Sequence, residues 1–154
     1  MEKLIVVRHG SYSSKTGRLT SFGEKQIERL ANFIKKTCSG NYWFACSGAD
    51  RAEGCVRILR DALDHKKYFE NWDELFDEKD YLILDKADKI HQRVNDIRDK
   101  ADNLVLVSHF SVATGYPTYF MQKEFRDIKG IDNVPMGKAV LVDIVKKDYD
   151  IIPH

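Results

Sequence analysis

Two histidines and two arginines of this sequence each come within a few residues of the end of an apolar run. They are Arg8, His9, Arg51 and His109. A guanidinium group presents a planar fork of N–H donors that fits the oxygens of a phosphoryl group. A neutral imidazole can attack phosphorus in line and form a phosphohistidine. These residue types predict phosphoryl chemistry if the fold brings them together.

Apolar runs predict the strands that must position these side chains. Continuous runs of this kind are typical of strands that are buried on both faces of a sheet. The predicted strands cover residues 4–7, 42–46, 104–107 and 139–145, with a short edge strand over residues 67–72. The acid-rich segment 71–81 is predicted as a loop or an irregular helix.

Amphipathic helices are predicted between the strands, because apolar residues recur there at spacings of three and four. The predicted helices cover residues 21–36, 51–63, 85–100 and 112–121. Thr20 or Ser21 is the expected N-cap of the first helix. Alternating strands and helices imply βαβ units, so we predict an α/β fold, a three-layer α/β/α sandwich with a mostly parallel sheet.

The carboxyl ends of parallel strands lie at one edge of a sheet, where ligands bind. We therefore expect Arg8, His9, Arg51 and His109 to line one crevice, with the amides of the helix that begins at Arg51 also favouring an anion. The cationic groups already supply a positive field, so no metal ion and no cofactor are predicted. Each side chain alone is commonly structural or solvated, and the prediction depends on their convergence. A nucleotide-binding doubly wound domain is disfavoured because no GxGxxG or GxxxxGK[ST] loop is present.

The composition favours one soluble globular domain over residues 1–154. The chain has 154 residues, 25 Lys and Arg against 24 Asp and Glu, and a net charge of +1, which argues against a nucleic-acid or acidic-membrane binder. No apolar run is long enough for a membrane span. Cys38, Cys46 and Cys55 form no CxxC pair, which favours a reducing, cytoplasmic location.

Four segments in order resemble the histidine phosphatase superfamily, the phosphoglycerate mutase-like proteins. The segment 6–10, VVRHG, is similar to the family signature, and 19–23, LTSFG, resembles the L-T-x-x-G segment that follows it. The segment 46–52, CSGADRA, is similar to S-S-P-L-x-R-A, and 105–109, VLVSH, to the strand with the second histidine. The resemblance implies a phosphohistidine on His9.

The resemblance also implies that Arg8, Arg51 and His109 complete the phosphate pocket and that a carboxylic acid protonates the leaving oxygen. The family's L-x-E segment aligns best with residues 72–74, which makes Glu74 the implied proton donor, with Asp73 and Glu70 as open alternatives. The sequence departs from the family pattern at three positions. Phe110 stands in place of glycine, Gly48 in place of proline, and Ser11 where Glu or Gln is frequent.

The implied activity is a metal-independent phosphatase acting on a small phosphorylated metabolite or a phosphohistidine protein. A phosphate- or phosphopeptide-binding pseudoenzyme of the same fold is the alternative. A phosphoglycerate mutase is disfavoured because the chain lacks room for the insertions that enclose phosphoglycerate. The oligomeric state is not predicted.

Overall fold

The structure is a computed structural model, and it describes residues 1–63, 69–127 and 130–154. Six strands form one sheet in the order β3-β2-β4-β1-β5-β6. The strands are β1 Lys3–Arg8, β2 Tyr42–Cys46, β3 Glu70–Asn71, β4 Asn103–Ser108, β5 Ala139–Asp143 and β6 Asp148–Ile152. The first four run parallel, and β5 and β6 are antiparallel to their neighbours. The predicted mostly parallel sheet is confirmed.

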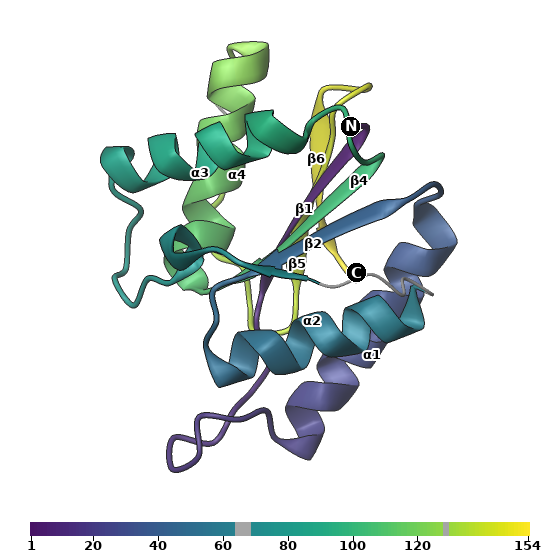
Figure 1. Cartoon of the computed structure of the whole chain (residues 1–154), viewed down its shortest axis with the longest axis vertical. Coiled ribbons are helices and arrows are strands. Elements are labelled where there is room, and N and C mark those ends of the chain that lie inside the picture. Colours follow the sequence, from purple (N-terminus) through teal and green to yellow (C-terminus); the bar gives the residue numbers. More distant parts are fainter. Residues whose placement is uncertain (64–68, 128–129) are drawn as a thin grey trace.

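Two layers of helices cover the sheet, as Figure 1 shows. The helices are α1 Ser21–Thr37, α2 Asp50–Ala62, α3 Leu84–Ile97 and α4 Phe110–Phe125, with a short 3-10 helix η1 Asp73–Leu75. Ile5 and Val7 of β1 pack with α1 and α2, whereas Leu4 and Val6 of the same strand pack with α3 and α4. This alternation fits a central strand that is buried on both faces. The three-layer α/β/α architecture is therefore confirmed.

The predicted helices and central strands are present, with ends that shift by a few residues. The last predicted strand ends at Asp143 rather than Val145, because a turn with Lys147 at φ 58 follows it. The sequence analysis missed β6, whose residues 148–152 alternate between exposed and more buried positions along a sheet edge. The predicted edge strand over residues 67–72 contains β3, whose two residues pair with β2. Lys67 and Tyr68 of that prediction lie outside the described residues. No helix within the described ranges is long and apolar enough to cross a membrane.

Candidate active site

A pocket of about 580 Å³ opens at the carboxyl ends of β1 and β4. Its walls are formed by Arg8, His9, Tyr12, Arg51, Asp77, Glu78, Lys79, Asp80, His109, Phe110 and Met136. The four side chains that were predicted to converge, the two arginines and the two histidines, all line this pocket. The order β2-β4-β1 explains this, because it places the ends of three parallel strands side by side.

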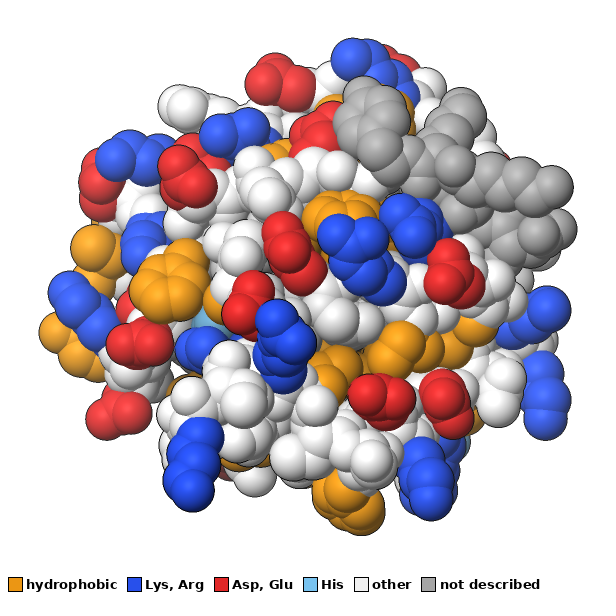
Figure 2. All heavy atoms as spheres, turned by 60° about the horizontal axis from the view of Figure 1, so that its bottom comes forward, with side chains coloured by type: hydrophobic (Ala, Val, Ile, Leu, Met, Phe, Trp, Pro, Cys, Tyr) orange, Lys and Arg blue, Asp and Glu red, His pale blue; other side chains and the backbone are white. Residues whose placement is uncertain are grey.

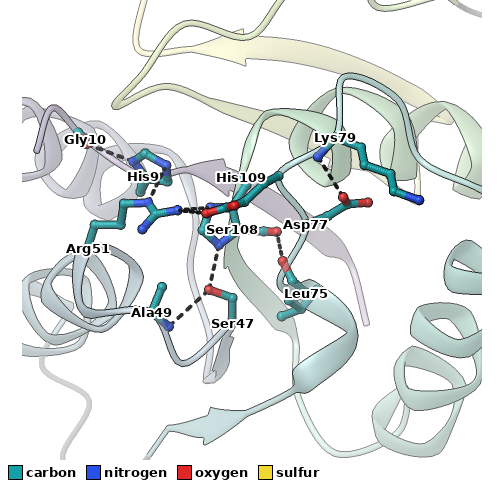
Figure 3. Close-up of polar contacts among 11 residues, drawn as sticks. His9, Gly10, Ser47, Ala49, Arg51, Leu75, Asp77, Lys79, Ser108 and His109 are labelled. Carbon is teal, nitrogen blue, oxygen red and sulfur yellow. Dashed lines mark hydrogen bonds and ion pairs between the residues drawn. The ribbon is translucent and has the colours of Figure 1, made fainter. Parts of the chain in front are cut away.

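His9 lines the pocket, and one of its ring nitrogens is unprotonated and faces Arg51. Its Nδ1 lies 2.9 Å from the carbonyl oxygen of Gly10, and Arg51 Nε donates to its Nε2 at 3.2 Å (Figure 3). Because arginine can only donate, Nε2 must accept, and the proton of the neutral ring lies on Nδ1. Burial lowers the pKa of His9 to about 4, and the charges of Arg51 and Arg8 act in the same direction. A neutral imidazole with Nε2 available is the nucleophilic form.

His109 lies beside His9, with ring centroids 5.1 Å apart. Its Nε2 lies 2.9 Å from Ser47 Oγ, and its Nδ1 accepts from Arg51 Nη2 at 3.3 Å. The proton of the neutral ring is therefore on Nε2 and is donated to Ser47. Burial lowers the pKa of His109 to about 3, and the neighbouring His9 and Arg51 add to this effect. The ring is thus neutral over the physiological pH range.

The two arginines supply the positive charge of the pocket. Arg51 contacts both histidines, and its guanidinium also lies over the ring of Tyr12 at 4.7 Å. Arg8 Nη1 donates to the carbonyl of Val134 at 3.0 Å, while its buried Nε has no hydrogen-bond partner. Burial lowers the pKa of Arg8 from its ordinary value. An anion that accepts from the free Arg8 N–H would satisfy a donor that is otherwise costly to bury.

Close backbone contacts fix the loop that carries His9. A Cβ on Gly10 would lie 2.7 Å from the carbonyl oxygen of Gly23, and a Cβ on Gly23 would lie 2.0 Å from that of Ser11. Thr20 caps α1 by accepting from the amide of Gly23 at 3.1 Å, and its hydroxyl donates to the Ser11 carbonyl. The segment LTSFG therefore packs the start of α1 against the loop after β1. The Gly10 amide also donates to Cys55 Sγ at 3.4 Å.

No family model and no curated protein matches this sequence. Solved structures do match its fold. The protein histidine phosphatase SixA, complexed with tungstate, is 14% identical with a TM-score of 0.70, and the match covers 97% of this chain and 93% of that one. A mycobacterial glucosyl-3-phosphoglycerate phosphatase, complexed with vanadate, is 12% identical with a TM-score of 0.69 over 92% of each chain.

A third match is a phosphoserine phosphatase mutant from Entamoeba histolytica, complexed with phosphoserine. It is 11% identical with a TM-score of 0.63, and the match covers 99% of this chain and 96% of that one. The chain has the histidine phosphatase fold. At these identities the likeness concerns the fold, and the chemistry of the site rests on its own residues.

The three carboxylates considered as proton donors do not line the pocket of this histidine phosphatase fold. Glu74 pairs with Arg93 of α3, with Oε2 2.9 Å from Nε. Glu70 accepts from Trp72 Nε1 at 2.8 Å, and Asp73 is exposed at the start of η1. Glu74, the proton donor that the resemblance implies, therefore lies outside the pocket, because η1 turns its side chain toward α3.

Asp77 is the buried carboxylate of the pocket, with 4% of its surface exposed. Its Oδ1 accepts from the amide of Lys79 at 2.9 Å, and its Oδ2 has no hydrogen-bond partner but lies 3.7 Å from Lys86 Nζ. The sequence analysis missed it, although a signal was present. Leu75-Phe76-Asp77 keeps the leucine of an L-x-acid segment, which Trp72-Asp73-Glu74 lacks.

Two departures from the family pattern have visible structural roles. Gly48 has φ 85, a conformation that proline cannot adopt, so the turn before α2 differs from one built on proline. Phe110 provides a ring under the Arg8 guanidinium at 5.0 Å. Both leave the four cationic and imidazole side chains at the pocket. In the described part of the chain, no three His, Cys, Asp or Glu side chains form a group that could hold a metal ion.

The low pKa values of the two histidines predict how activity and stability depend on pH. The pH dependence of kcat/KM reports the pKa values of essential groups in the free enzyme, here that of His9. For an aryl phosphate, after correction for ionisation of the substrate, we therefore expect the acid limb of kcat/KM at about pH 4 rather than near 6.5. Between these values the unfolded chain binds more protons than the folded one. The free energy of unfolding should therefore decrease as the pH falls from 6.5 toward 4. Rates and urea unfolding curves measured over this range check both expectations, and an acid limb near 6.5 would contradict them.

Proposed function

We propose that the protein is a metal-independent phosphatase that acts through a phosphohistidine on His9. The observation that carries this proposal is the unprotonated Nε2 of the buried His9, which faces the guanidinium of Arg51 in a pocket that Arg8 also lines. A phosphoryl group whose oxygens bind to the two arginines would lie where this nitrogen can reach phosphorus. The fold shared with several phosphatases supports the same reaction class.

In the first step, His9 Nε2 forms a bond to phosphorus as the bond to the leaving oxygen breaks. The ring gains positive charge, which the hydrogen bond from Nδ1 to the Gly10 carbonyl stabilises. Arg8 and Arg51 bind the transferring oxygens, and their fixed charges need no rearrangement as the charge moves. His109 is neutral, and its Nδ1 accepts from Arg51 Nη2, so it helps to hold the Arg51 guanidinium beside His9.

In the second step, water attacks the phosphorus of the phosphohistidine and the P–N bond breaks. His9 returns to its neutral form, and inorganic phosphate leaves. We assign Asp77 as the group that protonates the leaving oxygen in the first step and accepts the proton of water in the second, because it is the buried carboxylate of the pocket. Phosphomonoesters and phosphohistidine both remain candidate substrates under this scheme.

Turnover of p-nitrophenyl phosphate at mildly acidic pH, with EDTA present, tests the proposal. We expect hydrolysis that vanadate inhibits, because vanadate resembles the five-coordinate phosphorus of the transition state. Vanadate is bound by the mycobacterial phosphatase of the same fold. Binding of phosphate without any turnover would instead assign the pocket to a phosphate-binding pseudoenzyme, and loss of activity in EDTA would contradict the metal-independent mechanism.

The variant Asp77→Asn separates the proton donor from the other pocket residues. We expect it to slow hydrolysis of alkyl phosphates by roughly 10²–10⁴-fold, the usual contribution of general acid catalysis. Aryl phosphates should be slowed less, because nitrophenolate leaves without a proton. Glu74→Gln is the matched control and should change neither rate, since Glu74 pairs with Arg93 outside the pocket. Equal losses on alkyl and aryl substrates would exclude the donor role of Asp77.

A further inference from the structure

Exposed large hydrophobic side chains occur in the pocket and on the chain segment that runs through its wall. Eight large hydrophobic side chains are exposed in the described part of the chain, and six of them line the pocket or lie on residues 76–84. These six, which we call the apolar rim, are Tyr12, Phe76, Tyr81, Ile83, Leu84 and Met136. Figure 2 shows hydrophobic side chains next to the pale blue histidine on one face. Single exposed hydrophobic residues are ordinary, but a cluster next to a site marks an interaction surface.

The segment that carries most of the apolar rim is anchored, so its exposure is built into the fold. Leu82 packs on α4, where a Cβ on Gly115 would lie 2.8 Å from the Leu82 Cβ. Lys86 Nζ donates to the carbonyl of Phe76 at 2.8 Å. Tyr81 and Leu84 lie within this anchored stretch, close to Leu82 in the sequence, with 66% and 67% of their surfaces exposed. The fold therefore keeps these two side chains exposed to solvent.

The same segment is acidic. Residues 73–85 contain six Asp or Glu and one Lys. Glu78 and Asp80 line the pocket mouth, and Glu78 lies 3.5 Å from Arg51 Nη2. The pocket is thus cationic at the two arginines, whereas its mouth carries two carboxylates against one lysine, Lys79. A ligand that complements this pattern carries its anionic group deep in the pocket and cationic groups outside it.

We propose that the apolar rim, together with Glu78 and Asp80, docks a phosphorylated protein segment whose phosphoryl-bearing residue has apolar and basic neighbours. This inference rests on the phosphatase function proposed above and names its substrate class. A molecule small enough for the pocket contacts the pocket walls, which do not include Tyr81 or Leu84. Only a ligand that extends beyond the pocket covers these side chains. A second copy in a symmetric dimer fits poorly, because it would bring the acidic residues of both copies together.

The test compares peptide and small-molecule substrates on two double variants. Tyr81→Ser/Leu84→Ser removes the rim, and Phe22→Ser/Val145→Ser removes side chains of matched exposure, 65% and 72%, away from the pocket. The probes are p-nitrophenyl phosphate and synthetic peptides with Lys and Leu beside a phosphohistidine or a phosphoserine. The peptide that is hydrolysed faster is used, and a version with Glu in place of Lys is the charge control.

We expect the rim variant to raise KM for the Lys-Leu peptide by roughly tenfold or more, as loss of interface anchors does. Its kcat and its kinetics on p-nitrophenyl phosphate should not change, and the matched variant should change nothing. The Glu peptide should have the higher KM on the wild-type protein. Equal KM values for both double variants, or for both peptides, would overturn the docking surface, as would a wild-type dimer that the rim variant dissociates.

The failure of the proposed function has a different signature. In that case the wild-type protein hydrolyses neither p-nitrophenyl phosphate nor the peptides. Docking is then measured as the Kd of fluorescently labelled peptides by anisotropy. The docking surface requires that the rim variant raise this Kd by the same factor of roughly ten and that the matched variant leave it unchanged. A chain that hydrolyses p-nitrophenyl phosphate but binds the two peptides equally would keep its phosphatase function and lose the docking surface.

Discussion

His9→Ala is expected to abolish both phosphoryl labelling and turnover. Removal of a covalent nucleophile in other enzymes costs several orders of magnitude, so we expect kcat to fall by roughly 10⁴-fold or more. The reason is local, because among the described residues the only other ring nitrogen that accepts a hydrogen bond from Arg51 is His109 Nδ1. Incubation with a radiolabelled phosphoryl donor, followed by acid and alkali treatment, should give an acid-labile, alkali-stable label on the wild-type protein only.

Two further variants make the His9 experiment decisive. His154→Ala removes an exposed histidine outside the pocket and should keep both label and rate. His109→Ala should lower the rate but still permit labelling, since His109 contacts Arg51 without being the predicted nucleophile. Thermal unfolding must show that each variant is folded. A label that persists in His9→Ala and disappears in His109→Ala would exchange the roles of the two histidines.

The residues at the strand ends could be found from the sequence, because the strands before them are buried on both faces and are therefore recognisable as apolar runs. The residues Leu4, Val7, Leu104 and Val107 are fully buried in a sheet with helices on both faces, and this environment gives continuous apolar runs in the sequence. Once those runs are assigned to parallel strands, the residues after them must share one edge of the sheet. That reasoning located His9 and His109 without knowledge of the strand order.

Asp77, the proposed proton donor, could not be found in the same way, because it lies in a segment without periodicity. Between Trp72 and Leu84 the chain forms only the short helix η1, and the direction of each side chain depends on particular contacts. Arg93 holds Glu74 toward α3, whereas Asp77 turns inward beside the amide of Lys79. Neither contact follows from hydrophobic spacing. The edge strand β6 was missed for a related reason, since its polar alternation resembles that of a surface loop.

Arg51→Ala is expected to have the second largest effect, since this side chain joins the two histidines. It contacts His9 Nε2 at 3.2 Å and His109 Nδ1 at 3.3 Å, so its loss removes the positive charge nearest to the attacking nitrogen. Loss of one such electrostatic donor elsewhere costs roughly 10²–10³-fold in kcat, about 3 to 4 kcal/mol. Arg57→Ala on the same helix α2 is the matched control and should keep the rate, because Arg57 lies over Phe69 outside the pocket.

A second readout distinguishes Arg51 in the pocket from a merely structural role. The Arg51 charge lowers the pKa of His9, so Arg51→Ala should move the acid limb of kcat/KM to higher pH. Arg51→Lys should keep the acid limb close to its wild-type position, because it retains the charge. It should recover only part of the rate, because an ammonium lacks the planar fork that binds two oxygens. Two results together would remove Arg51 from the phosphate site. They are an unmoved acid limb and a rate loss below about tenfold in Arg51→Ala, which is well under the usual loss for one electrostatic donor. A rate loss with an unmoved limb would instead indicate that the side chain acts by holding α2 and its loop in place.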